Sequence, residues 1–162
     1  MATEVVWSST DNAGRVVLDR FDLVERASTG RDVIAAAILI RDGELLLGHR
    51  CATKMNFPNT WDVVGGHVEQ AESPRAALRR ELVEELGIDA SLGGAWRHII
   101  DDDLGIEMTL WLVTQWAGEV SNCAPHEHDE LRWFRHDELS ALGFPHHSYF
   151  ELLGDALSSA AR

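Results

Sequence analysis

The sequence is organised around residues 66–88, which read GHVEQAESPRAALRRELVEELGI. Ser73 can cap a helix through its hydroxyl oxygen, and Pro74 suits the first helical position. The residues that follow are nearly all good helix formers. Gly87 can adopt the left-handed conformation that commonly ends a helix. The segment therefore predicts a helix over about residues 74–86.

Three carboxylates share one face of this predicted helix. Glu81, Glu84 and Glu85 have i, i+3, i+4 spacing, which places them side by side. Such a face is either a solvated acidic surface or a cation site, and a divalent cation removes the repulsion among the acids. Mg²⁺ and Mn²⁺ prefer oxygen ligands, and Mg²⁺ is usually shared with substrate phosphates. Arg80 can orient one carboxylate through a bidentate pair, and Glu72 lies just before the helix, where a negative charge suits the helix dipole.

Composition and charge narrow the class of protein. The 162 residues suit one domain with a sizeable core, and a hydrophobic content of 45% is ordinary for a globular protein. The net charge of −13 argues against a nucleic acid polymer as the partner, because such binders carry basic patches. A small phosphorylated substrate is compatible with this charge if a metal ion supplies positive charge.

Targeting and redox signals predict a cytoplasmic protein. The N-terminus lacks the basic-then-apolar pattern of a signal peptide, and no apolar run approaches the length of a membrane span. Cys51 and Cys123 form no disulfide framework, which indicates a reducing compartment.

The rest of the chain predicts strands interleaved with a few helices. Residues 33–40 form a continuous apolar run typical of a buried central strand, and Asp42-Gly43 predicts a hairpin into a second strand at residues 45–47. Residues 51–60 are a predicted loop, and residues 61–64 are a short strand leading into Gly65-Gly66. Further predicted elements are strands at 88–92, 95–100, 106–116 and 131–134, an acidic solvated turn at 101–103, and helices at 137–142 and 148–158. Residues 1–30 predict an N-terminal hairpin extension of a single domain that spans 1–162.

This order of elements predicts an α/β fold with a mixed β-sheet and helices on both faces. The segment 66–88 matches the pattern G-x5-E-x7-R-E-U-x-E-E-x-G-U without a mismatch, where U is a bulky aliphatic residue. A chance match in a chain of this length has a probability on the order of one in ten million. The segment resembles the Nudix box, the signature of the MutT-like Nudix hydrolases. The resemblance implies the Nudix-type α/β/α sandwich.

The resemblance also assigns roles to residues of the box. Nudix hydrolases cleave a diphosphate linkage in a nucleoside diphosphate joined to another group. The family's metal-binding glutamates match Glu81, Glu84 and Glu85, and a further ligand is the backbone carbonyl of the glycine before the box, here Gly65. Glu72 and Arg80 match positions that orient these ligands, as partners of metal ligands commonly do. The implied cofactor is Mg²⁺, with Mn²⁺ as a substitute.

A glutamate outside the box completes the implied site. Many family members use one from a loop shortly before a strand that contains tryptophan, and Glu127 lies six residues before Trp133. Glu130 is the alternative to Glu127. If neither residue has a role in the site, the segment is a solvated acidic loop. For the general base, Glu81 is the first choice and Glu127 the second.

The leading functional hypothesis is Mg²⁺-dependent hydrolysis of a nucleoside triphosphate, including oxidised or modified ones, to a monophosphate and pyrophosphate. A nucleotide-sugar or ADP-ribose pyrophosphatase and a non-catalytic nucleotide-binding sensor are the alternatives. An isopentenyl diphosphate isomerase, which shares the fold, needs a cysteine beside the strand at 60–64, and none is present. A homodimer is compatible with the family, although no segment specifies an interface.

Three residues near the box are candidates for contacts with the substrate. Phe57 and Trp61 lie on the approach to the box, where one aromatic ring could stack on a nucleobase. His67 is a candidate phosphate contact, with a solvent-facing loop position as the alternative.

Overall fold

The fold is built on a mixed β-sheet, and the computed structural model describes residues 4–6 and 30–162 of the chain. In these ranges eight strands form one sheet with the order β1-β7-β8-β2-β3-β10, where β4 pairs with β3 and β5 pairs with β2. A separate two-stranded sheet joins β6 and β9. The elements are β1 (Glu4–Val6), β2 (Asp32–Arg41), β3 (Glu44–Arg50), β4 (Trp61–Asp62), β5 (Val64–His67), α2 (Pro74–Leu86), β6 (Asp89–Ala90), β7 (Arg97–Asp101), β8 (Ile106–Val113), β9 (Trp116–Ala117), β10 (His128–Phe134), η2 (His136–Ala141) and α3 (Tyr149–Ala160).

Strand β2 is the central strand that the apolar run predicted. It pairs in parallel with β8 along its length and antiparallel with β5 and β3. Successive side chains of a strand point to opposite faces of the sheet. Ala35, Ala37 and Leu39 belong to one buried cluster, whereas Ala36 and Ile38 belong to the other. The run is apolar throughout because both of its faces are buried.

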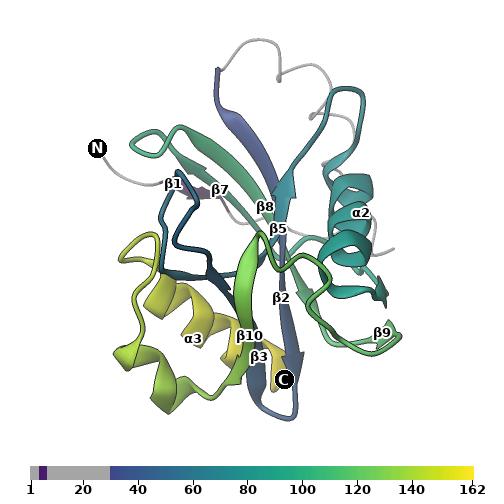
Figure 1. Cartoon of the computed structure of the whole chain (residues 1–162), viewed down its shortest axis with the longest axis vertical. Coiled ribbons are helices and arrows are strands. Elements are labelled where there is room, and N and C mark those ends of the chain that lie inside the picture. The colour runs from purple at the N-terminus through teal and green to yellow at the C-terminus, as the bar shows by residue number, and fades with distance from the viewer. Residues whose placement is uncertain (1–3, 7–29) are drawn as a thin grey trace.

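Helices cover both faces of the sheet (Figure 1). Helix α2 packs Leu78, Leu82 and Leu86 on one face, and α3 packs Leu152 and Leu153 on the other. The α/β/α sandwich with a mixed sheet that the sequence and its family resemblance predicted is confirmed.

The strand predicted at residues 61–64 is divided between two partners. Strands β2 and β3 pair only beside their connecting turn, from Ile40↔Leu45 to Arg41↔Glu44, and then diverge. Beyond that point Trp61–Asp62 pairs with β3, and Val64–His67 pairs with β2. The chain therefore changes its pairing partner at Val63, shortly before Gly65 and Gly66, where the box begins.

Several other predicted boundaries differ from the structure. The strand predicted at 88–92 is only Asp89–Ala90, and the one at 106–116 ends at Val113 before a separate short strand, Trp116–Ala117. These two short strands pair with each other in a sheet of their own, apart from the main sheet. The helix predicted at 137–142 is a 3₁₀ helix, and the final helix extends to Ala160.

The sequence predicted a solvated acidic turn at 101–103, and this prediction is wrong for Asp101. Asp101 is 6% exposed, and its Oδ1 accepts hydrogen bonds from the backbone nitrogens of Asp103 and Leu104, both at 3.0 Å. The carboxylate of Asp101 thus holds the β7–β8 turn by accepting hydrogen bonds from two of its backbone nitrogens. Asp102 is exposed and pairs with Arg31.

The N-terminal region is only partly described. Strand β1 pairs with β7 at the edge of the sheet, and the rest of the predicted hairpin at 1–30 lies outside the described residues. The single domain over 1–162 stays a prediction. None of the helices in the described ranges has the length and apolar character needed to cross a membrane.

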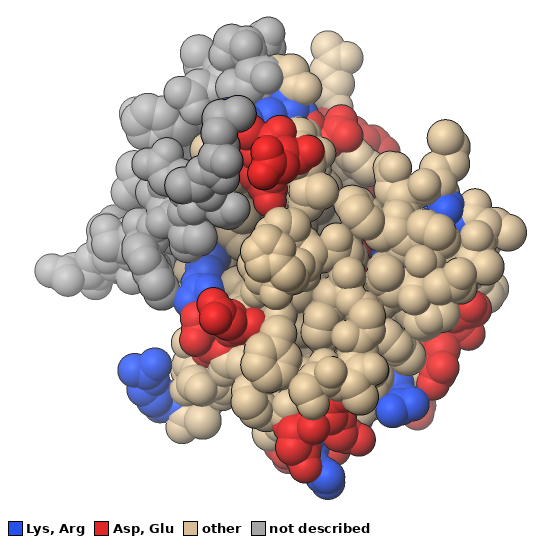
Figure 2. Space-filling view, turned by 90° about the vertical axis from the view of Figure 1, so that its left-hand side faces the viewer, with Lys and Arg blue, Asp and Glu red and all other residues tan. Residues whose placement is uncertain are grey.

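Charged side chains are dispersed over the face drawn in Figure 2. Among the residues coloured there, lysine and arginine form separate spots, with acidic groups between them. This face presents no continuous basic surface within the coloured part of the chain.

Candidate active site

Helix α2 has the boundaries that its sequence predicted. The backbone nitrogen of Ala76 donates to Ser73 Oγ at 3.1 Å, Pro74 opens the helix, and Gly87 ends it with a φ of 70°. Its residues Leu78, Leu82 and Leu86 are fully buried against the sheet, which fixes the rotation of the helix about its axis. The glutamates of the adjoining face are thereby directed toward β5 and the loop at 122–127.

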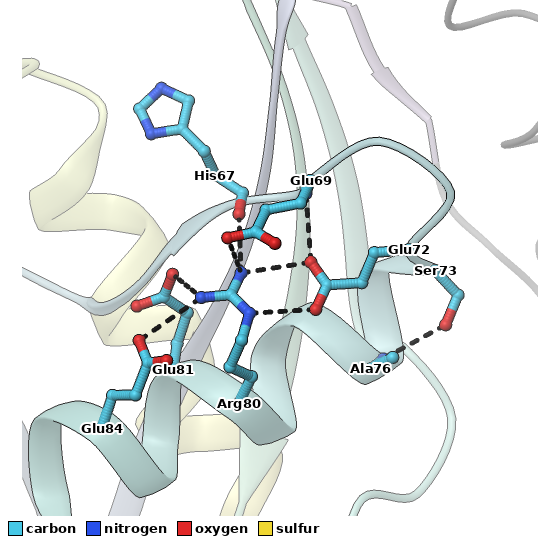
Figure 3. Close-up of polar contacts among 8 residues, drawn as sticks. All are labelled: His67, Glu69, Glu72, Ser73, Ala76, Arg80, Glu81 and Glu84. Carbon is cyan, nitrogen blue, oxygen red and sulfur yellow. Dashed lines mark hydrogen bonds and ion pairs between the residues drawn. The ribbon is translucent and has the colours of Figure 1, made fainter.

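Arg80 lies at the centre of a carboxylate cluster (Figure 3). It holds Glu72 with two nitrogens, and its Nη1 lies 2.8 Å from Glu81 Oε1 and 3.4 Å from Glu84 Oε2. It also donates to the backbone oxygen of His67 at 3.1 Å. The hydrogen bonds to Glu72 raise the pKa of Arg80, so the guanidinium stays charged. Arg80 therefore fixes the start of the box loop and the carboxylate of Glu81 together.

Burial and charge act in opposite directions on Glu81. Its side chain is 14% exposed, and this burial raises the pKa of the carboxyl, while Arg80 lowers it to a smaller extent. The charges of Glu84 and Glu127 also raise it. Because burial is the larger effect, Glu81 binds a proton more readily than an ordinary glutamate.

Gly65 and Gly66, at the start of the box, leave space for this cluster. A Cβ atom at Gly66 would lie 2.3 Å from Glu81 Oε1, so only glycine leaves the carboxylate in this position. Gly65 has a φ of 154°, and a Cβ atom there would lie 2.2 Å from the backbone oxygen of Ala35. Strand β5 thus approaches β2 and the acidic face of α2 closely because it lacks side chains at these positions.

Glu85 is the most buried acid of the cluster. It is 6% exposed, and its Oε2 has no hydrogen-bond partner among the described residues. Burial raises its pKa to about 8, and the nearby charges of Glu81 and Glu127 add to this, while a backbone hydrogen bond from Gly65 opposes it. An unpartnered buried carboxylate oxygen beside other acids is a position where a cation would be stabilising.

Glu127 reaches the same place from the loop before β10. The turn is set by the Glu127 nitrogen, which donates to the Ala124 oxygen at 2.9 Å, and by the Cys51 nitrogen, which donates to the Glu127 oxygen at 3.3 Å. The Glu127 carboxylate pairs with Lys54, and this hydrogen bond lowers its pKa. Glu130, the alternative from the sequence, lies on β10, is exposed, and has Arg132 at 4.0 Å. Glu127 lines both of the cavities described next, and Glu130 lines neither.

Two cavities that share a wall lie beside these acids. The outer one is lined by Glu81, Glu84 and Glu85 of α2 together with the loop at 123–127. The inner one has the apolar side chains of Ile34 and Met108 in its lining. The residues common to both are Lys54, Gly65, Gly66, His67, Glu85 and Glu127. Glu85 and Glu127 therefore lie between an outer cavity lined by the acids of α2 and an inner cavity that combines apolar side chains with charged ones.

The donor set fits a hard divalent cation. It consists of carboxylate oxygens, one of them buried and unpartnered, beside a backbone that lacks side chains at two positions. As the side chains stand, no three acid, histidine or cysteine groups in the described ranges are close enough to hold one ion. Arg80 holds Glu81 and Lys54 holds Glu127, so a bound ion would compete with these two cations for the carboxylates.

Asp62 and Lys54 are polar residues of the inner cavity that were not found from the sequence. Asp62 accepts from Tyr149 Oη at 2.9 Å and from the Val63 nitrogen at 2.8 Å, and burial raises its pKa. The signal that could have found it is an acid inside the short apolar strand at 61–64. Lys54 is the other, and its signal is that the sequence contains no second lysine.

His128 was also missed, because the sequence predicted a strand only from residue 131, whereas β10 begins at His128. It is 5% exposed, and burial lowers its pKa to about 4, so it is neutral at pH 7. Its ring fills the space over Gly48, where a Cβ atom would lie 2.4 Å from Cδ2 of the ring.

The structure separates the three candidates for contacts with the substrate. His67 lines both cavities, and its side chain is 71% exposed. Trp61 packs edge-on against Phe134, with ring centroids 4.9 Å apart. Neither Trp61 nor Phe57 lines either cavity, so stacking on a base held there is not supported for these two rings.

Comparison with known proteins gives the family of this chain. The model of the NUDIX domain matches residues 30–153. The chain belongs to the Nudix family. The match contains the whole 66–88 segment and all the cavity-lining residues named above, so the resemblance read from the sequence is confirmed.

Similar Nudix proteins carry names of nucleotide-cleaving enzymes. An Escherichia coli protein named CTP pyrophosphohydrolase is 37% identical over 115 residues, which are 69% of this chain and 80% of that protein. An 8-oxo-dGTP diphosphatase from Proteus vulgaris is 31% identical over 91 residues, which are 55% of this chain and 80% of that protein.

Solved structures agree with the fold. The solution structure of the E. coli ORF135 protein has a TM-score of 0.66 and 34% identity, and covers 84% of this chain and 96% of that one. The crystal structure of a MutT Nudix hydrolase from Burkholderia pseudomallei has a TM-score of 0.61 and 29% identity, and covers 78% of this chain and 95% of that one. Nudix hydrolases act on small nucleotide substrates and generally depend on divalent metal ions.

Proposed function

We propose that this Nudix protein hydrolyses a nucleoside triphosphate to a nucleoside monophosphate and pyrophosphate, with Mg²⁺ as the metal ion and Mn²⁺ as a substitute. The observation that carries the proposal is the buried, unpartnered Oε2 of Glu85, which lies among the carboxylates of the Nudix box. A buried carboxylate oxygen that has no hydrogen-bond partner among the described residues destabilises the ionised acid, and a bound cation would offset this cost.

Each acid has a role in this proposal. Glu81, Glu84, Glu85, Glu127 and the backbone carbonyl of Gly65 would hold the metal, which when bound supplies an activated water and neutralises phosphate oxygens. Glu72 and Arg80 position Glu81, because the guanidinium holds both carboxylates at once. Groups that position a metal ion in this way would increase the rate mainly by orientation and electrostatics.

Glu81 is our first choice for the general base. Its burial raises the pKa of its carboxyl, which makes it a better proton acceptor than an exposed glutamate. Glu127 is the second choice, because its pairing with Lys54 lowers its pKa. The assignment predicts that loss of Glu81 removes more of kcat than loss of Glu127 does.

The inner cavity is our proposed position for the nucleoside. Its lining combines the apolar side chains of Ile34 and Met108 with the buried carboxyl of Asp62. Pockets for nucleosides commonly combine an apolar lining with a few placed polar groups. The names of the similar proteins make CTP and 8-oxo-dGTP the first substrates to test. We further propose a cytoplasmic enzyme, because Cys51 and Cys123 are both free thiols.

The test is product analysis by mass spectrometry. The protein is incubated with a panel of nucleoside triphosphates, oxidised triphosphates, nucleotide sugars and ADP-ribose, with Mg²⁺ and with a chelator. We expect the wild type to cleave a triphosphate in the presence of Mg²⁺. The rate of the Glu85→Gln variant should fall by more than the roughly 10–100-fold typical of residues that only orient a metal ligand.

The matched control is Glu151→Gln, which removes an exposed acid from α3 and should leave the rate unchanged. Cleavage of only a nucleotide sugar or ADP-ribose would replace the substrate class. Absence of turnover with both Mg²⁺ and Mn²⁺ would contradict the enzyme and favour a sensor.

A further inference from the structure

Lys54 is the sole lysine of the sequence, and it lies in the wall shared by the two cavities. We propose that Lys54 binds the phosphate chain of the substrate, and that Glu127 is its counter-ion while no phosphate is bound. The inference rests on the proposed function, since it assigns a contact to the phosphates of that substrate.

The other cations near the cavities are already engaged. Arg50 donates through Nε and Nη2 to the Asn56 oxygen, at 3.0 and 2.8 Å, and its Nη1 lies 3.6 Å from Asp62. The guanidinium of Arg80 is held by Glu72 and Glu81. Among the groups that line both cavities, Lys54 is therefore the cation best placed to meet an anion.

The pairing of Lys54 leaves it capacity for a further partner. An ammonium carries three N–H donors, and its hydrogen-bond partner among the described residues is one oxygen of Glu127. The two side chains are 26% and 35% exposed, and ion pairs at such positions contribute little to stability. A role in holding the fold is therefore a poor explanation for this pair.

The loop that carries Lys54 is held in shape by hydrogen bonds. The Lys54 nitrogen donates to the Cys51 oxygen at 3.1 Å, and Thr60 Oγ1 donates to the Phe57 oxygen at 2.7 Å. Arg50 holds the loop at Asn56, as described above. The next residue, Met55, is 98% exposed, so the loop directs Lys54 inward while its neighbour points to solvent. A fixed backbone reduces the ordering cost when a ligand binds.

Glu127 is well placed to exchange partners. Glu127 lines both cavities together with Glu85 and Lys54, so it lies beside an acid of α2 as well as beside Lys54. If Glu127 turned away from Lys54 to help the acids of α2 hold a metal ion, Lys54 would lose its counter-ion. A phosphate oxygen would then supply the negative charge that Lys54 needs.

The experiment uses inorganic tripolyphosphate, which carries no base and so does not depend on the substrate's identity. Protein produced with ¹³C-labelled lysine gives one ε-methylene NMR signal, because the sequence has one lysine. The signal is followed during titration with tripolyphosphate in the presence of a chelator. Calorimetry gives the dissociation constant for the wild type and for Lys54→Gln, Glu127→Gln and Glu84→Gln.

We expect a saturable shift of the Lys54 signal. Lys54→Gln should weaken binding about tenfold, within the range for a hydrogen bond to a charged group. Glu127→Gln should tighten it several-fold, because it frees Lys54. Glu84→Gln is the matched control: it removes an acid of the outer cavity that contacts Arg80, so it should tighten binding less.

Three results would overturn the inference: an unmoved Lys54 signal, unchanged binding in Lys54→Gln, or equal gains in Glu127→Gln and Glu84→Gln. The last would mean that any loss of negative charge suffices. A protein that cleaves triphosphates while its Lys54 signal stays unmoved contradicts this inference alone. A protein that binds tripolyphosphate through Lys54 and cleaves no triphosphate contradicts the proposed function.

Discussion

Arg80 and Glu72 form a bidentate ion pair that joins α2 to the loop before it, with Nε 3.0 Å from Oε1 and Nη2 3.1 Å from Oε2. The same carboxylate accepts from the Glu69 nitrogen at 3.0 Å, so the pair also fixes the backbone of the box loop. A lysine cannot reproduce this planar contact, because its ammonium is a point charge without the guanidinium fork.

The pair predicts that Arg80→Lys lowers kcat by about 10–100-fold, the range for groups that orient a metal ligand. Glu81 would lose its bond to Nη1 along with the contact to Glu72. Mn²⁺ affinity, measured by electron paramagnetic resonance, should fall in parallel. The neighbouring exposed arginine supplies the control, Arg79→Lys, which should match the wild type. Equal activity of the two variants would mean that charge alone matters at position 80.

We expect the Gly66→Ala substitution to lower activity while the protein stays folded. The Cβ atom in Gly66→Ala would lie 2.3 Å from Glu81 Oε1, and that carboxylate is the free end of a flexible side chain that can move aside. Activity should fall on the order of 100-fold, as for other misplaced ligands, while the midpoint of urea unfolding stays near that of the wild type. Gly93→Ala, where nothing lies within 4 Å, is the control. A fully active Gly66→Ala variant would show that Glu81 does not need this position.

For Gly65 we expect the reverse, namely that substitution lowers the stability of the fold. In Gly65→Ala the Cβ atom would lie 2.2 Å from the backbone oxygen of Ala35, at a φ of 154°. Neither backbone can yield without breaking the β2–β5 pairing, so the variant should lose about 3 kcal/mol of unfolding free energy. Chemical denaturation measures this value. A stability equal to that of Gly66→Ala would contradict the close packing of β5 on β2.

Glu85 predicts a pH-dependent stability in the presence of a chelator. Its pKa is about 8 in the folded protein against 4.5 for an unperturbed glutamate. Between these values the folded state binds a proton that the unfolded state does not, so this group makes the protein less stable as pH rises. Above pH 8 the penalty of a buried charge is complete, and below pH 4.5 it is absent.

The Glu85→Gln variant isolates this contribution, since it carries no titrating group at position 85. Thermal unfolding in chelator should show the variant gaining stability relative to the wild type as pH rises from 4.5 to 8. Added Mg²⁺ should narrow the gap by stabilising the ionised wild type. A gap that stays constant with pH would mean that Glu85 is ionised throughout.

The sequence predicts best what depends on neighbouring residues. The cap at Ser73, Pro74 at the first helical position and the left-handed Gly87 are local signals, and they place α2 within a residue. The buried run of β2 is equally clear, because two helices cover it. The family resemblance adds the fold, since the same box occurs in proteins of known structure.

Features that depend on residues far apart in the chain could not be predicted from the sequence. The division of residues 61–64 between β3 and β2 follows from the divergence of those two strands, which no local pattern encodes. Asp101 looked solvated because its acidic neighbours are exposed, yet its own carboxylate is buried against the turn. Lys54 lies 73 residues from Glu127, so only the folded chain brings the two together.

The central proposal is metal-dependent hydrolysis of a nucleoside triphosphate at the acidic face of α2. The most direct measurement follows the reaction with CTP and Mg²⁺ by ³¹P NMR, beside the Glu85→Gln variant and a chelator control. We predict equal amounts of CMP and pyrophosphate, abolished by the chelator and by the variant. Formation of CDP and orthophosphate, or turnover that survives in Glu85→Gln, would contradict the account.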